Sequence, residues 1–281
     1  MMKLVKRILI IIFVCVLILV GLITYNNNKI ELRQEEIISN KLDNLENYHV
    51  IYFSDLHFTN FINKDYLEKV INRINEEEPD LVIFGGDLID KLQDNPINDK
   101  EKNDLIDALS SIKAKNGKYA ILGNHDYNNG SYEIVENIYF KSDFKLLKDS
   151  CIEVAIDDSN SINLLGIDSL FFSWDLFLDS YKDINPNNYT FAIIHHPDLI
   201  DYLLDYPFDY VLTAHSHGGQ IYIPLFEKLY HRIYGCNKYF RGIYNFDNYT
   251  IDVSNGVGRT KLNARFNADS EIVKYTLKSA K

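Results

Sequence analysis

Short apolar runs alternate with longer amphipathic stretches along most of this chain, from residue 49 onward. The apolar runs predict buried strands at 50–53, 81–84, 119–122, 190–194 and 210–213. After each of the first three runs, apolar positions recur at helical spacing and predict helices over 65–77, 99–112 and 131–139. Strands that alternate with helices favour an α/β fold with a largely parallel sheet and right-handed crossovers.

The pattern changes after the third helix. Residues 151–156 and 161–167 predict a β-hairpin around a polar turn, and the alternating tail predicts strands at 249–253 and 271–277. We find no internal repeat and no second linker. The sequence therefore predicts one domain over 48–281, preceded by a polar tether over 26–47 that contains a candidate edge strand at 30–38.

The amino terminus has a different character. Three basic residues precede an unbroken apolar stretch from Ile8 to Ile23, a pattern shared by signal peptides and signal anchors. The stretch is long for a signal-peptide core and slightly short for a standard spanning helix of about 20 residues. No small-x-small cleavage pattern follows it, which favours retention. A buried core helix is disfavoured because the run has no polar face.

Residues 1–25 are therefore predicted to form a transmembrane signal anchor. Positive charge flanks only its N-terminal side, so we expect a single-pass protein of the cell membrane whose catalytic domain is extracytoplasmic. The sequence leaves open whether the segment is cleaved.

Composition narrows the class of protein. An apolar content of 46% in 281 residues is typical of a globular protein, and the net charge of -11 argues against a nucleic-acid partner. Outside the apolar N-terminus the cysteines are Cys151 and Cys236. Whether they pair is left open, and no cysteine cluster competes for metal.

Five short polar segments carry the candidate chemistry, and each follows a predicted strand. They are Ser54–His57, Gly85–Asp87, Gly123–Asp126, His195–Pro197 and Ala214–His217. Ligands of α/β sheets bind outside the carboxyl ends of strands, so we expect these segments to meet at one sheet edge. In Asp-x-His and His-x-His, residues two apart on a strand share a face. The candidate metal ligands are Asp55, His57, Asp87, Asn124, His195, His215 and His217.

This donor set mixes nitrogen and oxygen, which suits Zn, Mn, Fe or Co better than Ca. Seven ligands are too many for one ion and fit two ions that share a carboxylate. Two ions ~3.5–4 Å apart can hold a bridging hydroxide and phosphate oxygens for in-line attack at phosphorus. The candidate acid for the leaving alkoxide is His125, with Asp126 orienting its ring.

Taken singly, each segment also has a structural interpretation. Asp-x-His can be a surface pair, Gly-Gly-Asp a turn, and a histidine before proline a satisfied core residue. Six of the chain's eight histidines fall inside the five segments, however, with only His49 and His231 elsewhere. A shared site explains this grouping better than five unrelated turns.

The segments resemble the signature of the calcineurin-like metallophosphoesterases, which is D-x-H, G-D-x-x-D, G-N-H-[DE], H and G-H-x-H. The resemblance covers essentially everything after the apolar N-terminus. The residues Gly218-Gly219-Gln220, the segment 253–258 and Arg265-Phe266 are similar to the membrane-associated bacterial branch.

The resemblance implies an αββα sandwich with both metals on one sheet edge. It implies one ion held by Asp55, His57, Asp87 and His217, and a second held by Asp87, Asn124, His195 and His215. It also implies that His125 protonates the leaving group. The family's spacing of ligand, one residue, then proline favours His195 over His196 as the ligand, with His196 lining the substrate pocket.

Two departures from the family pattern carry information. Ala214 stands where glycine is usual, which matters only if that position needs a positive φ. Protein serine/threonine phosphatases extend the second motif to G-D-x-V-D-R-G and end the third in glutamate. Here Asp90 is followed by Lys91-Leu92, and the third motif ends in Asp126. This argues against a phosphoprotein phosphatase, and Asp90 is interpreted as a carboxylate that supports the ligands or the fold.

The favoured hypothesis is an anchored two-metal phosphoesterase that acts on a phosphodiester or pyrophosphate. Its topology makes a lipid headgroup or an envelope component a reasonable substrate. The rival is a catalytically silent metal-binding scaffold protein with the same fold. Aromatic stretches at 171–174 and 226–246 are interpreted as core packing, or alternatively as membrane-facing or substrate-capping loops. The sequence leaves the oligomeric state open.

Overall fold

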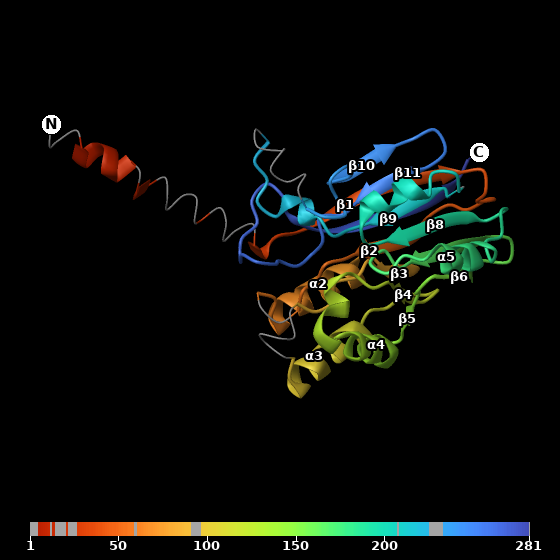
Figure 1. Ribbon diagram of the computed structural model, residues 1–281, viewed down its shortest axis with the longest axis horizontal. Helices are drawn as coiled ribbons and strands as arrows, with labels where there is room; N and C mark the ends of the chain where they lie inside the picture. Colours follow the sequence, from red (N-terminus) through yellow and green to blue (C-terminus); the bar gives the residue numbers. More distant parts are fainter. Residues whose placement is uncertain are drawn as a thin grey trace.

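The computed structural model describes residues 5–11, 13–14, 21, 27–58, 61–90, 97–206, 208–224 and 233–280. In this part of the chain, two six-stranded sheets face each other (Figure 1). The first sheet has the order β1 (Ile30–Ser39), β12 (Ser270–Ser279), β2 (Tyr48–Phe53), β3 (Leu81–Phe84), β4 (Lys118–Ala120) and β5 (Phe144–Leu146). Of its strand pairs, only β12 with β2 is antiparallel.

The second sheet has the order β10 (Gly242–Asn245), β11 (Thr250–Val253), β9 (Tyr210–Thr213), β8 (Tyr189–Ile194), β7 (Ser161–Ile167) and β6 (Ser150–Ala155). Its three central pairs are parallel and its two outer pairs antiparallel. The predicted hairpin is confirmed as β6 and β7. The Asp157 carboxylate closes its turn by accepting the backbone N–H groups of Ser159 and Asn160.

Helices cover the outer faces of both sheets. The helices α2 (Lys64–Glu76), α3 (Asp99–Ser110) and α4 (Tyr132–Lys141) lie against the first sheet, and α5 (Trp174–Tyr181) against the second (Figure 1). Short 3₁₀ helices occupy His125–Gly130 (η1), Pro197–Tyr202 (η2) and His217–Gly219 (η3). Side-chain caps begin two of the predicted helices: Asn63 caps α2, and Asn98 forms a capping box with Glu101 on α3.

Apolar packing holds these four layers together. Buried side chains of both sheets meet between them, among them Tyr52, Leu164 and Phe191. A second cluster joins the first sheet to its helices, and a third joins the second sheet to α5 and η2. The expected α-β-β-α arrangement with largely parallel strands is therefore confirmed.

The tether contributes to the first sheet. Strand β1 pairs in parallel with β12 along its whole length, from Ile30 beside Ser270 to Ser39 beside Ser279, so the predicted edge strand is confirmed. Among the described α-helices and strands, β5, β10 and α5 were not predicted. Both strands lie at sheet edges and are only partly buried, so neither forms the continuous apolar run that predicted the buried strands. Along 171–174, Phe172 packs on the core, whereas Phe171 is 60% exposed and Trp174 45% exposed.

The predicted anchor lies largely outside the described residues. Of the run from 8 to 23, residues 8–11, 13, 14 and 21 are helical, and their apolar side chains are exposed where burial is described. Residues 12, 15–20, 22 and 23 are outside the described set. Among the described residues, no helix combines the length and apolar character needed to cross a membrane.

Candidate metal centre

The segments that follow β2, β3, β8 and β9 meet at one edge of the sandwich. Backbone hydrogen bonds tie them together in pairs: Asp55 donates to the Gly86 carbonyl (2.9 Å), and Ala214 donates to the His195 carbonyl (3.2 Å). A further bond joins the two sheets, because the backbone N–H of His215 donates to Asp55 Oδ1 (3.2 Å). The expected convergence of distant segments at strand ends is therefore present.

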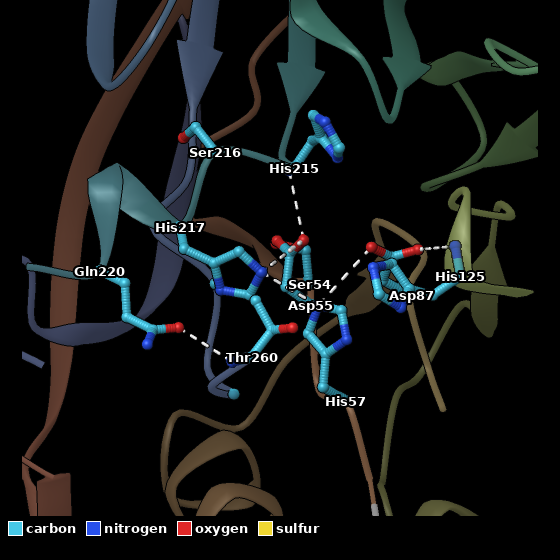
Figure 2. Close-up of polar contacts among 12 residues, drawn as sticks. Ser54, Asp55, His57, Asp87, His125, His215, Ser216, His217, Gln220 and Thr260 are labelled. Atoms are coloured by element: carbon cyan, nitrogen blue, oxygen red, sulfur yellow. Dashed lines mark hydrogen bonds and ion pairs between the residues drawn. The ribbon is translucent and has the colours of Figure 1, made fainter. Parts of the chain in front are cut away.

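Six of the seven candidate ligands form two compact groups. One potential ligand atom from each of Asp55, His57 and His217 lies within 4.8 Å of the others, and the same holds for Asp87, His195 and His215. The two groups touch through one carboxylate. Asp87 Oδ2 is 3.2 Å from His195 Nε2 and 3.6 Å from His57 Nε2. Asp87 therefore lies between the groups, as Figure 2 shows for this side chain beside Asp55 and His57.

Hydrogen bonds to the far side of two imidazoles leave their inner nitrogens available for a cation. His195 Nδ1 lies 2.8 Å from the Gly85 carbonyl, and His215 Nε2 lies 2.8 Å from the Tyr234 carbonyl. Because a carbonyl only accepts, each of these nitrogens carries the proton. In the neutral rings, the lone pairs are on His195 Nε2, which faces Asp87, and on His215 Nδ1.

A buried acceptor without a protein partner gives a second indication of a bound cation. The side-chain oxygen of Asn124 is buried and makes no hydrogen bond to another described residue. Orphaned buried acceptors are costly unless something outside the protein satisfies them. Lone-pair nitrogens, an amide oxygen and carboxylates gathered in this way are the donors that a borderline divalent cation binds. The residues present therefore fit a metal centre.

Left-handed backbone conformations direct the side chains of five candidate ligands. Five candidate ligands have a positive φ of 48° to 72°, and they are Asp55, His57, Asp87, His215 and His217. Such left-handed backbone costs roughly 1–2 kcal/mol at a residue with a Cβ, and strain of this kind collects at functional sites. Ala214 is not among the described residues with a positive φ, so the missing glycine has no conformational consequence.

This observation corrects one expectation. The strand β2 ends at Phe53, so Asp55 and His57 do not share a strand face. They lie in the loop beyond the strand. The positive φ of each residue, and not the alternation of side chains along a strand, sets the direction of its side chain. His215 and His217 likewise follow the end of β9 at Thr213.

Two glycines allow backbone to pack directly on the carboxylates. A Cβ at Gly123 would lie 2.2 Å from Asp87 Oδ1, and one at Gly256 would lie 2.7 Å from both Cβ and Oδ2 of Asp55. Both distances are far inside van der Waals contact, so the carboxylate positions depend on these glycines.

His125 borders the same centre, with its ring edge-on to that of His57 at 4.6 Å between centroids. Its Nδ1 lies 2.9 Å from Asp90 Oδ1. Burial opposes protonation of the ring, but the Asp90 and Asp87 carboxylates outweigh it, so the pKa of His125 is raised above its ordinary value.

The prediction that Asp126 orients His125 is wrong. The buried Asp126 carboxylate instead accepts the backbone N–H groups of Asp87 (2.8 Å), Leu88 (2.8 Å) and Gly123 (2.9 Å). It thereby fixes the two loops that carry Asp87 and Asn124. The carboxylate beside His125 is that of Asp90, which the sequence had assigned only a supporting role.

The adjacent histidines His195 and His196 have different surroundings. His195 belongs to the second ligand group. The ring of His196 instead contacts that of His215 edge-on, at 4.2 Å between centroids, and its Nδ1 lies 2.8 Å from Ser169 Oγ. Burial lowers the pKa of His196 to about 2, so its ring is neutral.

Sequence reasoning did not assign a role to Arg265, which is fully buried behind the centre. Its guanidinium donates to the backbone carbonyls of Gly258 (2.6 Å), Asn255 (2.8 Å) and Ala268 (2.8 Å). Its Nη2 also lies 3.4 Å from His217 Nδ1. Arg265 therefore shapes the loop that supports His217. In the sequence, Arg265 was noted only because Arg265-Phe266 is similar to a pattern in the membrane-associated bacterial branch.

A cavity of about 320 Å³ opens beside the ligands. Its lining includes the polar residues Asp87, His125 and His217. Its walls come from loops after β9 and β11, which contact each other through a hydrogen bond from the Thr260 backbone to Gln220 Oε1 (2.9 Å; Figure 2). The cavity gives a small ester group access to the centre.

Known proteins resemble this chain in sequence and in fold. Residues 48–219 match the family described as calcineurin-like phosphoesterase. An uncharacterized metallophosphoesterase of Bacillus subtilis, YkuE, is 30% identical over 83% of this chain and 80% of its own length. The UDP-2,3-diacylglucosamine pyrophosphatase LpxG of Chlamydia muridarum is 25% identical over 66% of this chain and 68% of its own. A solved dimetal phosphatase from Danio rerio is similar with a TM-score of 0.46 and 10% identity, over 75% of this chain and 88% of that one.

The family match spans more than half of the chain and contains all the candidate ligands. The chain therefore belongs to the calcineurin-like phosphoesterase family and is a metal-dependent hydrolase of phosphate esters.

Proposed function

We propose that this protein is a membrane-anchored enzyme that hydrolyses a phosphodiester or a pyrophosphate with the help of two divalent cations. The observation that carries the proposal is the position of Asp87. Its Oδ2 faces His195 of one ligand group and His57 of the other, which is the arrangement required of a carboxylate shared by two ions.

In this proposal Asp55, His57, Asp87 and His217 hold one cation. Asp87, Asn124, His195 and His215 hold the second. The mixed nitrogen and oxygen donors suit Mn, Zn or Fe. When bound, such a pair supplies a nucleophile near neutral pH and neutralises charge on the phosphate group.

The chain's own contribution is a positioned proton donor. His125 Nδ1 faces Asp90 Oδ1, so its Nε2 is the atom left to give a proton to the leaving oxygen. The raised pKa keeps more of the ring in the acid form near neutral pH. The ring also lines the cavity, while its side chain is only 20% exposed. It can therefore reach substrate while water has limited access to its proton.

Three observations support the substrate class. The relatives from Chlamydia are named as pyrophosphatases of UDP-2,3-diacylglucosamine, which favours a pyrophosphate or diester over a phosphoprotein. The residues after Asp90 and the aspartate that ends the third motif point the same way. The acidic net charge of -11 disfavours a nucleic-acid substrate.

The membrane location is proposed from the apolar run between Ile8 and Ile23. Basic residues on its N-terminal side alone favour a catalytic domain outside the cytoplasm. A phosphate ester of a lipid headgroup or envelope component is the substrate that this location favours.

The test is turnover of bis(p-nitrophenyl) phosphate and p-nitrophenyl phosphate by the full chain in detergent. The protein is first treated with chelator and then supplied with Mn, Zn or Fe. We expect hydrolysis that depends on added metal and is lost in Asp87→Asn. The control His49→Asn changes a histidine outside the five segments and should retain activity. Metal binding without turnover of either ester would instead favour the silent scaffold.

A further inference from the structure

One wall of the cavity is attached to the segment that follows the apolar N-terminal run. The wall is the loop from Gly258 to Arg265, of which Thr260, Lys261 and Leu262 line the cavity. Asn27 Nδ2 donates to the Asn263 carbonyl (2.8 Å), and Asn27 Oδ1 accepts the Arg265 backbone N–H (2.9 Å). The side chain of Asn27 therefore links the N-terminal segment to this wall.

A third contact strengthens the link. Arg259 Nη1 donates to the Asn27 carbonyl (2.7 Å), and Arg259 is itself buried, with its guanidinium over the ring of Tyr66. Asn27 thus contacts the wall through its backbone and through both ends of its amide. In Figure 1 the described residues that lead into β1, drawn red-orange, lie beside loops coloured blue.

The length of the connection limits how far the wall can lie from the apolar run. Asn27 is the fourth residue after Ile23. Four residues span at most about 14 Å even when fully extended. If the run lies in a bilayer, as proposed above, the cavity wall is held within about that distance of the membrane surface.

The mouth of the cavity also has the chemistry of a membrane surface. Leu262, which lines the cavity, is 56% exposed. Ile221 and Ile233 also line it, and close to them in the sequence Ile223 is 40% and Tyr234 81% exposed. Exposed apolar and tyrosine side chains that surround a site mark contact with an apolar or interfacial phase.

Charge at the mouth is compatible with phosphate. Lys261 lines the cavity in the same loop as Leu262, and a lysine near a membrane surface attracts anionic headgroups. The mouth thus offers a cation for phosphate and apolar side chains for the remainder of an amphiphile.

A second exposed apolar surface provides the contrast. On and before α5, Phe171 is 60% exposed, Trp174 45% and Leu176 50%. Acidic residues interrupt this surface at Asp175 and Asp179, which disfavours an anionic bilayer. Figure 1 places α5 on the side of the domain away from the N-terminal segment.

We infer that the cavity opens onto the bilayer and that Asn27 holds it there. The substrate class is then a membrane-embedded amphiphile whose phosphodiester or pyrophosphate enters from the lipid surface. This inference rests on the proposed function and deepens it, since it specifies how substrate reaches the metal centre.

The experiment compares two substrates that release the same chromophore. The full chain is reconstituted in phosphatidylcholine vesicles that contain phosphatidylglycerol, with Mn or Zn added. One substrate is dioleoylphosphatidyl-p-nitrophenol in the same vesicles, and the other is soluble bis(p-nitrophenyl) phosphate. The measured quantity is the ratio of the vesicle rate to the soluble rate, which does not depend on the amount of folded protein.

We expect Leu262→Asp to lower this ratio about tenfold, because the apolar contact of one leucine is sufficient for a factor of that size. The matched control is Leu176→Asp, a substitution of the same kind on α5 at similar exposure, and it should leave the ratio unchanged.

A second variant leaves the domain itself intact. Twelve glycine and serine residues are inserted between Tyr25 and Asn26, so that the contacts of Asn27 are kept while the connection becomes about four times longer. Effective concentration falls as about the −3/2 power of linker length, so the ratio should fall about eightfold.

The outcomes separate the two proposals. A ratio unchanged by both Leu262→Asp and the insertion overturns the inference, while hydrolysis of the soluble ester keeps the proposed function. A ratio lowered by Leu176→Asp and not by Leu262→Asp overturns it in favour of the α5 surface. No metal-dependent hydrolysis of either substrate by the unaltered protein means that the proposed function itself has failed.

Discussion

Replacing Asp90 by asparagine tests how the acid is controlled. The substitution keeps the size of the side chain and removes the charge that lies 2.9 Å from His125 Nδ1. Asp90 is 1% exposed and the His125 side chain 20% exposed, so water screens this pair weakly. Without the carboxylate, the protonated form of His125 loses its principal stabilising partner, and the pKa of the ring falls.

The size of the effect depends on the leaving group. General acid catalysis contributes about 10²–10⁴ to the rate when the leaving oxygen needs a proton. A charged hydrogen bond contributes about 1.5–3 kcal/mol, which corresponds to a loss of roughly 10- to 100-fold in Asp90→Asn for a poor leaving group such as an alkoxide. A p-nitrophenolate leaves without a proton, so its release should change little.

The assay is the pH–rate profile of metal-loaded protein with a methyl ester and with a p-nitrophenyl ester. Activity that needs protonated His125 falls as pH rises through the pKa of the ring. Since Asp90→Asn lowers that pKa, the fall on the basic side should move to lower pH. A profile that Asp126→Asn moves and Asp90→Asn does not would refute this assignment. We expect Asp126→Asn to act on stability instead, because an amide cannot accept all three backbone N–H groups.

Further predictions concern protons, packing and the loop behind the centre. Burial opposes protonation of His195, but the Asp87 and Asp55 carboxylates raise its pKa to about 9. In chelated protein the protonated ring therefore stabilises the folded state fully below about pH 6.5, and this stabilisation is lost as the pH rises through about 9. The melting temperature should fall across that pH range. Metal must displace this proton, so calorimetry in buffers of different ionisation enthalpy should show proton release on binding at pH 7, and none would count against His195 as a ligand. Gly256→Ala places a Cβ 2.7 Å from Asp55 Oδ2 at a residue with φ of +67°, so metal affinity should fall at least about tenfold, whereas Gly130→Ala, also at positive φ but with no atom within 4 Å, should cost only stability. Arg265→Met removes a donor 3.4 Å from His217 Nδ1 and should weaken metal binding more than it slows metal-saturated turnover; equal loss of both would mean that the residue is purely structural.

The ligands could be predicted because metal chemistry restricts residue type and because strand ends converge. Asp55, Asp87 and His195 are recognisable on both grounds, and the apolar runs before them are unmistakable. The strands β5 and β10 lie at sheet edges and lack the continuous apolar run that identifies the buried strands. The route by which the ligands converge was not predictable either, because a left-handed turn at Asp55 or His215 depends on tertiary packing rather than on local propensity.

The partner of His125 shows a further limit. Asp126 directly follows His125 in the third motif, whereas Asp90 belongs to the second, so sequence distance favours Asp126. The 3₁₀ turn that begins at His125 points the Asp126 side chain back toward the backbone of Asp87 and Leu88. That direction depends on three-dimensional packing between two loops. From the sequence, only the family's spacing before proline favoured His195 over His196 as the metal ligand.

The metal content of purified protein tests the central claim most directly. The full chain is chelated, reloaded with Mn or Zn, freed of excess metal and measured by inductively coupled plasma mass spectrometry alongside Asp87→Asn and His49→Asn. Two ligand groups that meet at Asp87 predict two ions per chain in the unaltered protein and in His49→Asn, and loss from both sites in Asp87→Asn. A single ion per chain, or an Asp87→Asn protein that still holds two, would contradict a centre built on this shared carboxylate.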